Sequence, residues 1–223
     1  MNIKKLFGHD SKVRVRTKEE LKIRENEFLK ICKILDETNI KYFLDTGILL
    51  GAVRHNGFIP WDWDVELSVF SDEAYYKIEI LIDKLNDKGF KIEKYYKELS
   101  RLKIDFTGRL EAEANKYTIQ GWNHDKIKKI FWRNSYRNPE HFFINMKKIK
   151  LFDRYHYAPY PLEKYLEFKY GNWKKPLQTS NKYLYMKKEF SGKNYIKDTF
   201  KKILKKKDFL YVRKFLRKIL FHV

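Results

Sequence analysis

Carboxylates alternate with apolar residues over one short segment, and this alternation constrains the fold most. Asp62, Asp64 and Glu66 are separated by Trp63 and Val65. In a β-strand alternate side chains point to the same face, so the pattern predicts a strand with an acidic face. Like charges this close repel each other, and a shared divalent cation relieves that repulsion. The sequence therefore predicts a Mg²⁺ or Mn²⁺ site at this strand, with a merely solvated strand face as the alternative.

A glycine-rich segment directly precedes these acids. Gly47, Gly51 and Gly57 permit tight backbone turns, and Arg54 and His55 add positive charge among them. Backbone amides beside cations are suited to binding phosphate oxygens. The segment therefore predicts a phosphate-binding loop, with Gly47, Arg54 and His55 as candidate donor-binding residues. A surface role for Arg54 and a turn-capping role for His55 are the alternatives.

The segment GILLGAVRHNGFIPWDWDVE, residues 47–66, resembles the hallmark of the LicD family, which includes the fukutin-like proteins. The segment YPLEKYLEFKYGNWKKP, residues 160–176, resembles the closing segment of the same family. The resemblance implies an α/β fold (α+β) like that of nucleotidyltransferases, with a mixed sheet and flanking helices. It also implies transfer of a phospho-substituent, such as phosphocholine or a polyol phosphate, from a CDP-linked donor to a cell-surface glycan.

Some positions depart from the family pattern. Trp63 replaces the family's middle acid, Glu66 replaces its last Asp, and Ile48 stands where the family usually has a hydroxyl residue. The alternation of acid and apolar residue is kept at Asp64 and Glu66, so these two stay the implied metal ligands. Asp62 is interpreted as a third ligand, a supporting group or a loop-capping acid. Whether Ile48 and Trp63 reduce or redirect the activity is left open.

Two further acids follow apolar strand patterns. Asp105 lies within LKIDFTG, and a buried carboxylate there needs a partner, either a neighbouring Lys or Arg or the same metal. The resemblance implies a third carboxylate on a neighbouring strand, so Asp105 is a candidate metal ligand and general base. Asp45, at the end of the strand before the glycines, is a candidate for positioning the loop or the acceptor.

Tryptophans flank the predicted site. Trp61, Trp63 and Trp173 are candidates for an aromatic wall that binds a choline-like cation or a sugar ring. Packing of these rings in the core is the alternative. The sequence has no zinc-type His/Cys spacing, no Walker-type lysine loop and no Gly-x-Ser-x-Gly elbow, so covalent nucleophilic catalysis has no candidate.

Apolar periodicity and turn residues predict the order of the elements. Thr17 and Glu20 form a capping box that begins a helix. The segment 108–140 has no clear assignment, and another hairpin within it is left open. Helices are expected at 17–38, 48–54, 72–87 and 161–171, and strands at 40–44, 63–69, 90–96, 102–106 and within 142–153.

Positive charge is concentrated at the C-terminal end. The formal net charge is +20, and residues 181–223 hold 14 Lys or Arg against three acids, a net of +11. Apolar residues at helical spacing among these cations predict a basic amphipathic helix that binds an anionic membrane surface. Packing of this helix on the domain is the alternative. We divide the chain into a basic arm (1–16), a LicD-like domain (17–180) and this tail (181–223).

The acidic row and the family resemblance together imply a metal-dependent transferase of phosphorus-containing groups. The partners that the resemblance implies are a CDP-activated donor and a glycan acceptor, with a lipid-linked acceptor left open. No segment is apolar enough for a signal peptide or a membrane span, so we expect a cytoplasmic protein, and peripheral attachment to the inner face of the membrane is left open. The alternatives are transfer of a nucleotide to a small molecule, or a non-catalytic module that binds membrane or nucleic acid. Nucleic acid is disfavoured because the acidic row repels phosphates.

Overall fold

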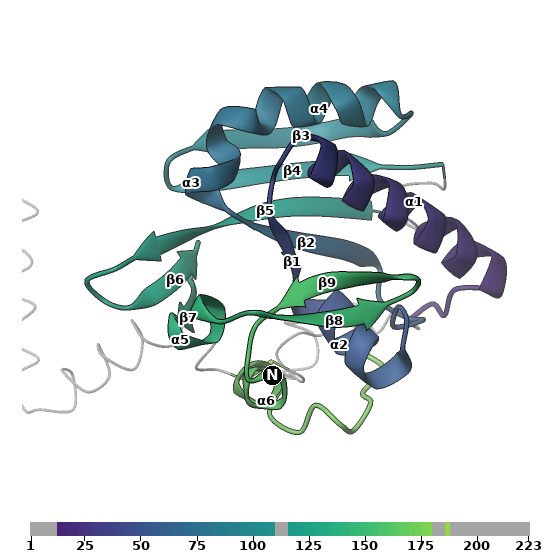
Figure 1. Cartoon of the computed structure of the whole chain (residues 1–223). Coiled ribbons are helices and arrows are strands. Elements are labelled where there is room, and N and C mark those ends of the chain that lie inside the picture. The colour runs from purple at the N-terminus through teal and green to yellow at the C-terminus, as the bar shows by residue number, and fades with distance from the viewer. Residues whose placement is uncertain (1–12, 110–115, 180–185, 188–223) are drawn as a thin grey trace, which may run out of the picture.

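The computed structural model in Figure 1 describes residues 13–109, 116–179 and 186–187. A mixed sheet with helices on both sides forms the fold, which confirms the predicted α/β class. The helices are α1 (Lys18–Glu37), α2 (Thr46–His55), α3 (Ser71–Ala74), the 3-10 helix η2 (Tyr75–Lys77), α4 (Ile78–Asp87), α5 (His141–Ile144) and α6 (Leu162–Tyr170). The strands are β1 (Tyr42–Leu44), β2 (Asp64–Phe70), β3 (Lys91–Glu98), β4 (Arg101–Thr107), β5 (Lys116–Asp125), β6 (Ile130–Arg133), β7 (Tyr136–Pro139), β8 (Lys147–Leu151) and β9 (Arg154–Ala158).

Strand β2, which carries the acids, lies in the middle of the sheet. The described strands follow the order β3-β4-β5-β2-β1-β9-β8, and β6 and β7 continue from the end of β5. β2 runs parallel to β5 and antiparallel to β1, and β1 runs parallel to β9. The segment 108–140, which the sequence left unassigned, therefore supplies the strand beside the acids. Strands on both sides of β2 can place side chains next to them.

The sheet has one apolar face and one polar face around β2. Val65 is in register with Tyr117, and the Tyr117 hydroxyl donates a hydrogen bond to Glu27 of α1 at 2.9 Å. The apolar side chains of β2 therefore face α1, which lies with α4 on one side of the sheet in Figure 1. Asp64 and Glu66 alternate with these residues and point to the opposite face. Helix α6 lies on that opposite side.

Capping interactions begin the first two helices. Thr17 accepts a hydrogen bond from the backbone N–H of Glu20 at 3.2 Å, and the Glu20 carboxylate accepts one from the Thr17 N–H at 2.9 Å. This confirms the predicted capping box at the start of α1. Asp45 caps α2 by accepting from the Thr46 N–H at 2.7 Å. The second cap fixes the start of α2 directly beside the acidic strand.

The strand predicted within 142–153 is present as β8, but the start of this segment forms helix α5 instead. Phe142 and Phe143 of α5 are both buried. The paired strands are β8 and β9, joined at Phe152. Phe152 has a φ of 54°, and its ring packs against Phe28 at a centroid distance of 5.9 Å. The β8–β9 turn therefore combines a left-handed backbone conformation at Phe152 with packing of the Phe152 ring on Phe28.

Some predictions lie outside the described residues. These are the amphipathic helix in 181–223, apart from residues 186–187, and most of the basic arm in 1–16. Of the arm, Arg16 is buried, and its N–H donates to the Pro60 carbonyl at 2.8 Å. Among the helices described, none has the length and apolar character needed to cross a membrane.

Candidate active site

Three carboxylates lie together at the start of β2 and in the loop before it. Asp62, Asp64 and Glu66 are each partly buried. Burial raises the pKa of Asp62 to about 6, and the nearby charge of Glu66 acts in the same direction. Burial, Glu66 and Asp62 together raise the pKa of Asp64 well above its ordinary value. The three groups therefore repel one another and hold more negative charge than their protein partners neutralise.

Gly47, in the first turn of helix α2, allows one of these acids to approach the helix. A Cβ atom at Gly47 would collide with the Asp62 carboxylate. Gly51 is close-packed in a different way, because a Cβ there would lie 2.5 Å from the Gly57 carbonyl oxygen and 3.2 Å from the Ile59 nitrogen. Gly47 thus brings α2 against the acidic cluster, whereas Gly51 packs α2 on the loop that returns to β2.

Arg54 and His55 lie at the other end of α2 from Gly47. With a rise of about 1.5 Å per residue, Arg54 is roughly 12 Å along the helix axis from Thr46. The Arg54 guanidinium donates to the Trp173 carbonyl at 3.2 Å, and the His55 ring packs edge-on against Trp61 at 5.7 Å. The structure therefore places the candidate phosphate-binding residues in two groups, with Gly47 beside the acids, and Arg54 and His55 beside Trp173 and Trp61 at the other end of α2.

The tryptophans are divided in the same way. Trp61 and Trp173 lie near the C-terminal end of α2, through their contacts with His55 and Arg54. Trp63 is 55% exposed, and Lys116 of β5 lies over its ring with Nζ 5.8 Å from the centroid. Trp63 is therefore an exposed tryptophan next to Asp62 and Asp64. A ligand-binding surface there would consist of the Trp63 ring and Lys116.

Asp105 faces the same side of the sheet as Glu66 but has its own partners. Both residues are in register with Thr118 of β5, which lies between them. Lys103 donates to Asp105 Oδ2 at 2.7 Å, and Thr118 donates to Oδ1 at 2.7 Å. Lys116 lies 3.9 Å from the same carboxylate. The lysine partner that the sequence left open is therefore present.

The four predicted metal ligands do not form one cluster. Two inter-strand spacings put the Cα atoms of Glu66 and Asp105 about 10 Å apart. Among the described residues, no group of three or more His, Cys, Asp or Glu side chains is arranged to hold a metal ion. A Mg²⁺ site in a phosphate-transferring protein commonly uses one or two carboxylates and takes other ligands from substrate phosphates and water. The repelling carboxylates at β2 fit that smaller donor set.

Sequence reasoning did not single out two buried cations that support this site. Arg24 of α1 donates to the backbone carbonyls of Asp62 and Trp63 at 2.9 and 3.2 Å, so it fixes the loop that carries the acids. Lys169 of α6 is fully buried and pairs with Asp45. Lys169 lies seven residues after Leu162 on the inward stripe of α6. A lysine on an apolar stripe was the signal that could have revealed it.

Comparison with known proteins gives consistent matches. The sequence model described as "LicD/FKTN/FKRP, nucleotidyltransferase domain" matches residues 39–161. The ribitol 5-phosphate transferase FKRP of Homo sapiens is 26% identical over 149 residues, which cover 62% of this chain and 29% of that protein. An uncharacterized protein of Rickettsia prowazekii is 30% identical over 135 residues, covering 60% of this chain and 42% of that protein.

A shorter match involves a bacterial enzyme. The lipopolysaccharide cholinephosphotransferase LicD of Haemophilus influenzae is 33% identical over 54 residues, which cover 24% of this chain and 20% of that protein. The chain therefore spans less than half the length of these curated relatives. The family match includes the acidic strand, the glycine segment and Asp105, all of which lie within residues 39–161.

Proposed function

Because the chain belongs to the LicD family, we propose that it is a transferase of phosphorus-containing groups. Two of the relatives named above carry ribitol 5-phosphate or cholinephosphate transfer in their names. The finer proposal is transfer of phosphocholine or a polyol phosphate from a CDP-linked donor to a hydroxyl of a cell-surface glycan. The observation that carries it is the cluster of repelling carboxylates on β2, within the matched segment.

Asp64 and Glu66 are the residues proposed to hold Mg²⁺ or Mn²⁺, with Asp62 beside them. The metal would neutralise charge on the donor phosphates as the bond to the leaving nucleotide breaks. The protein's own contribution is to keep carboxylate oxygens together at the centre of a rigid sheet, with Thr46 donating to Glu66 at 3.0 Å. Preorganised groups of this kind cost no rearrangement during the reaction.

Lysines on the same face supply the complementary charge. Lys116 is opposite Asp64 in the register of β2 and β5, and Lys103 and Lys116 both lie beside Asp105. We propose that these lysines bind donor phosphate oxygens as point charges, with Asp105 as a further carboxylate that supports the site from outside the cluster of Asp62, Asp64 and Glu66. The rival role for Asp105 is that of an ion-pair partner for Lys103 alone.

The test is to identify the released product. The purified chain is incubated with Mn²⁺, CDP-choline or CDP-ribitol and an oligosaccharide acceptor, and CMP and the acceptor's gain in mass are measured. We expect CMP release that depends on both the metal and the acceptor. The matched control is Asp83→Asn, an exposed acid on α4, which should release CMP at the wild-type rate, whereas Asp64→Asn should not. No CMP from any donor would contradict the proposal.

Nucleotide transfer is the second candidate, because the matching family model is described as a nucleotidyltransferase domain. That reaction keeps the nucleotide on the product and releases pyrophosphate from a nucleoside triphosphate. Pyrophosphate from CTP or ATP, without CMP from CDP-linked donors, would favour it. The cytoplasmic location and the binding of anionic membrane by residues 181–223 remain separate predictions. The membrane binding is tested by flotation of the chain with vesicles, with and without residues 197–223.

A further inference from the structure

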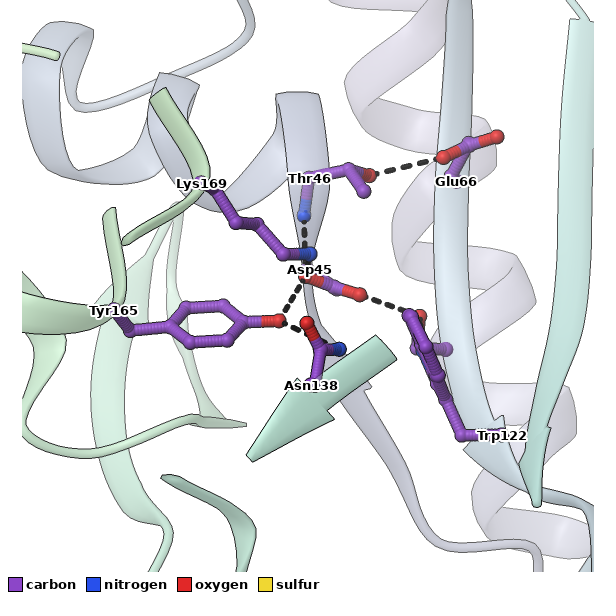
Figure 2. Close-up of polar contacts among 8 residues, drawn as sticks. Asp45, Thr46, Glu66, Trp122, Asn138, Tyr165 and Lys169 are labelled. Atoms are coloured by element: carbon purple, nitrogen blue, oxygen red, sulfur yellow. Dashed lines mark hydrogen bonds and ion pairs between the residues drawn. The ribbon is translucent and has the colours of Figure 1, made fainter. Parts of the chain in front are cut away.

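A buried polar network connects helix α6 to the start of α2. Asp45 is fully buried at its centre and accepts hydrogen bonds from the Tyr165 hydroxyl at 2.8 Å and from the Ser68 hydroxyl at 3.3 Å. It also accepts from the Thr46 N–H at 2.7 Å and forms an ion pair with the fully buried Lys169. Figure 2 shows these groups converging on Asp45. Four donors thus reach one carboxylate from α6, α2 and β2, and the charge of Arg133 on β6 also acts on it.

Burial of the Asp45–Lys169 ion pair removes both charges from water, which costs free energy of folding. Burial lowers the pKa of Lys169 to about 8, although the attraction of Asp45 opposes the shift. Burial acts to raise the pKa of Asp45, but Lys169 and Arg133 bring it below its ordinary value. Well-packed apolar residues often stabilise a core as well as a buried ion pair does. Core stability alone therefore gives little reason to place a lysine and an aspartate here.

Thr46 carries the network on to the acidic strand. Its N–H is held by Asp45, and its hydroxyl donates to Glu66 Oε2 at 3.0 Å, as Figure 2 shows. Its φ is 47°, a left-handed conformation that a β-branched residue adopts rarely and at a cost. Such a conformation persists only where the surroundings hold it. The Asp45 carboxylate supplies one such restraint, and the Glu66 carboxylate supplies the other.

We propose that Lys169 and Tyr165 are positioning residues that act through Asp45 and Thr46 to fix the Glu66 carboxylate in its metal-binding orientation. The inference rests on the proposed function, because it assigns Glu66 to a metal site. It makes α6 part of the active site although α6 is separated from β2 by about 90 residues of sequence. Supporting groups of this kind commonly contribute about 10- to 100-fold to metal affinity or activity.

The test measures Mn²⁺ affinity of the full chain by calorimetry and its stability by thermal unfolding. Thr46→Val removes the hydroxyl but keeps the branched shape, and Thr46→Ser keeps the hydroxyl. The double variant Asp45→Asn with Lys169→Met removes both buried charges together, so neither is left unpaired. Leu81→Ala, in the core beneath α4, is the control for lost stability away from the network.

We expect Thr46→Val to lose about 10- to 100-fold in Mn²⁺ affinity and Thr46→Ser to recover most of it. The double variant should show a similar loss, and adding Thr46→Val to it should cost little more, because both act through one path. Leu81→Ala should unfold at a lower temperature and bind Mn²⁺ like the wild type. If the double variant does not fold, the Mn²⁺ affinities of Thr46→Val and Thr46→Ser still show whether the Thr46 hydroxyl positions Glu66.

Unchanged Mn²⁺ affinity in Thr46→Val would overturn the inference. So would equal losses in Thr46→Val and Thr46→Ser, since the hydroxyl would then not be the group that acts. The proposed function fails separately: the wild type would bind Mn²⁺, and Thr46→Val would weaken that binding, yet no CDP-linked donor would release CMP. CMP release by the wild type, with normal Mn²⁺ affinity in Thr46→Val, would overturn the positioning role alone.

Discussion

Strand β2 has an apolar face toward α1 and α4 and an acidic face on the opposite side of the sheet. Val65, Leu67 and Val69 are almost completely buried on the first face, where they pack with aliphatic and aromatic side chains. On the second face, Asp64 and Glu66 repel each other. One face lowers the free energy of the fold by removing apolar surface from water, whereas the other concentrates like charge at a cost. Side-chain alternation thus puts core residues on one face of this strand and the proposed metal ligands on the other.

The largest expected effect tests the acidic face directly. Asp64→Asn or Glu66→Gln should reduce transfer by more than about 100-fold, beyond the range for supporting residues, because each removes a proposed metal ligand. Removing one of several like charges should leave the unfolding temperature unchanged or raise it. Turnover, Mn²⁺ affinity and thermal unfolding are measured together, with Asp83→Asn as the matched control. Wild-type Mn²⁺ affinity in both variants would refute the metal assignment.

The apolar face should show the reverse behaviour. Leu81→Ala leaves a cavity under α4 and should lower the free energy of unfolding by about 2–5 kcal/mol. Activity per folded molecule should stay at the wild-type value, because Leu81 lies on the side of the sheet away from the acids. Chemical denaturation gives the stability, and turnover is measured well below the unfolding transition. A large loss of turnover in folded protein would show that the two faces are coupled.

Asp105 sharpens the comparison, since it is on the acidic face but already has cationic partners. If Asp105 supports the metal site as a further carboxylate, Asp105→Asn should weaken Mn²⁺ binding by about tenfold, the lower end of the range for supporting groups. Lys103→Met provides the comparison, because it removes the ion pair and leaves the carboxylate. Equal Mn²⁺ affinity in wild type and Asp105→Asn would restrict Asp105 to pairing with Lys103.

The smallest expected effect is a pH dependence of stability. The folded-state pKa of Asp62 is raised to about 6, so the native protein binds more protons than the unfolded chain between about pH 4 and pH 6. Stability of the metal-free protein should therefore fall as pH rises through this window, and the raised pKa of Asp64 acts in the same direction. Asp62→Asn should flatten this part of the profile. Stability that rises across the window by the same amount in wild type and variant would contradict the shift.

Local patterns predicted much of the fold. Alternation gave β2 its acidic face, and the Thr17–Glu20 pair marked the start of α1, because both features depend only on nearby residues. Within residues 108–140, β6 and β7 form the hairpin that the sequence left open, whereas β5 was not predicted. Its assignment as a strand depends on pairing with β2 and β4, which lie far away in the sequence.

The sequence by itself pointed to the candidate site residues: the alternating acids, the glycine segment and the family motif around them. The helix predicted at 48–54 already separated Arg54 and His55 from Gly47 along α2. Tertiary structure alone decided the partners of these residues: it brought Asp62 against Gly47, paired Asp105 with Lys103, and joined α6 to Glu66 through Asp45. Side-chain alternation is a local property of the chain, whereas the neutralisation of a buried charge depends on which distant segment packs against it.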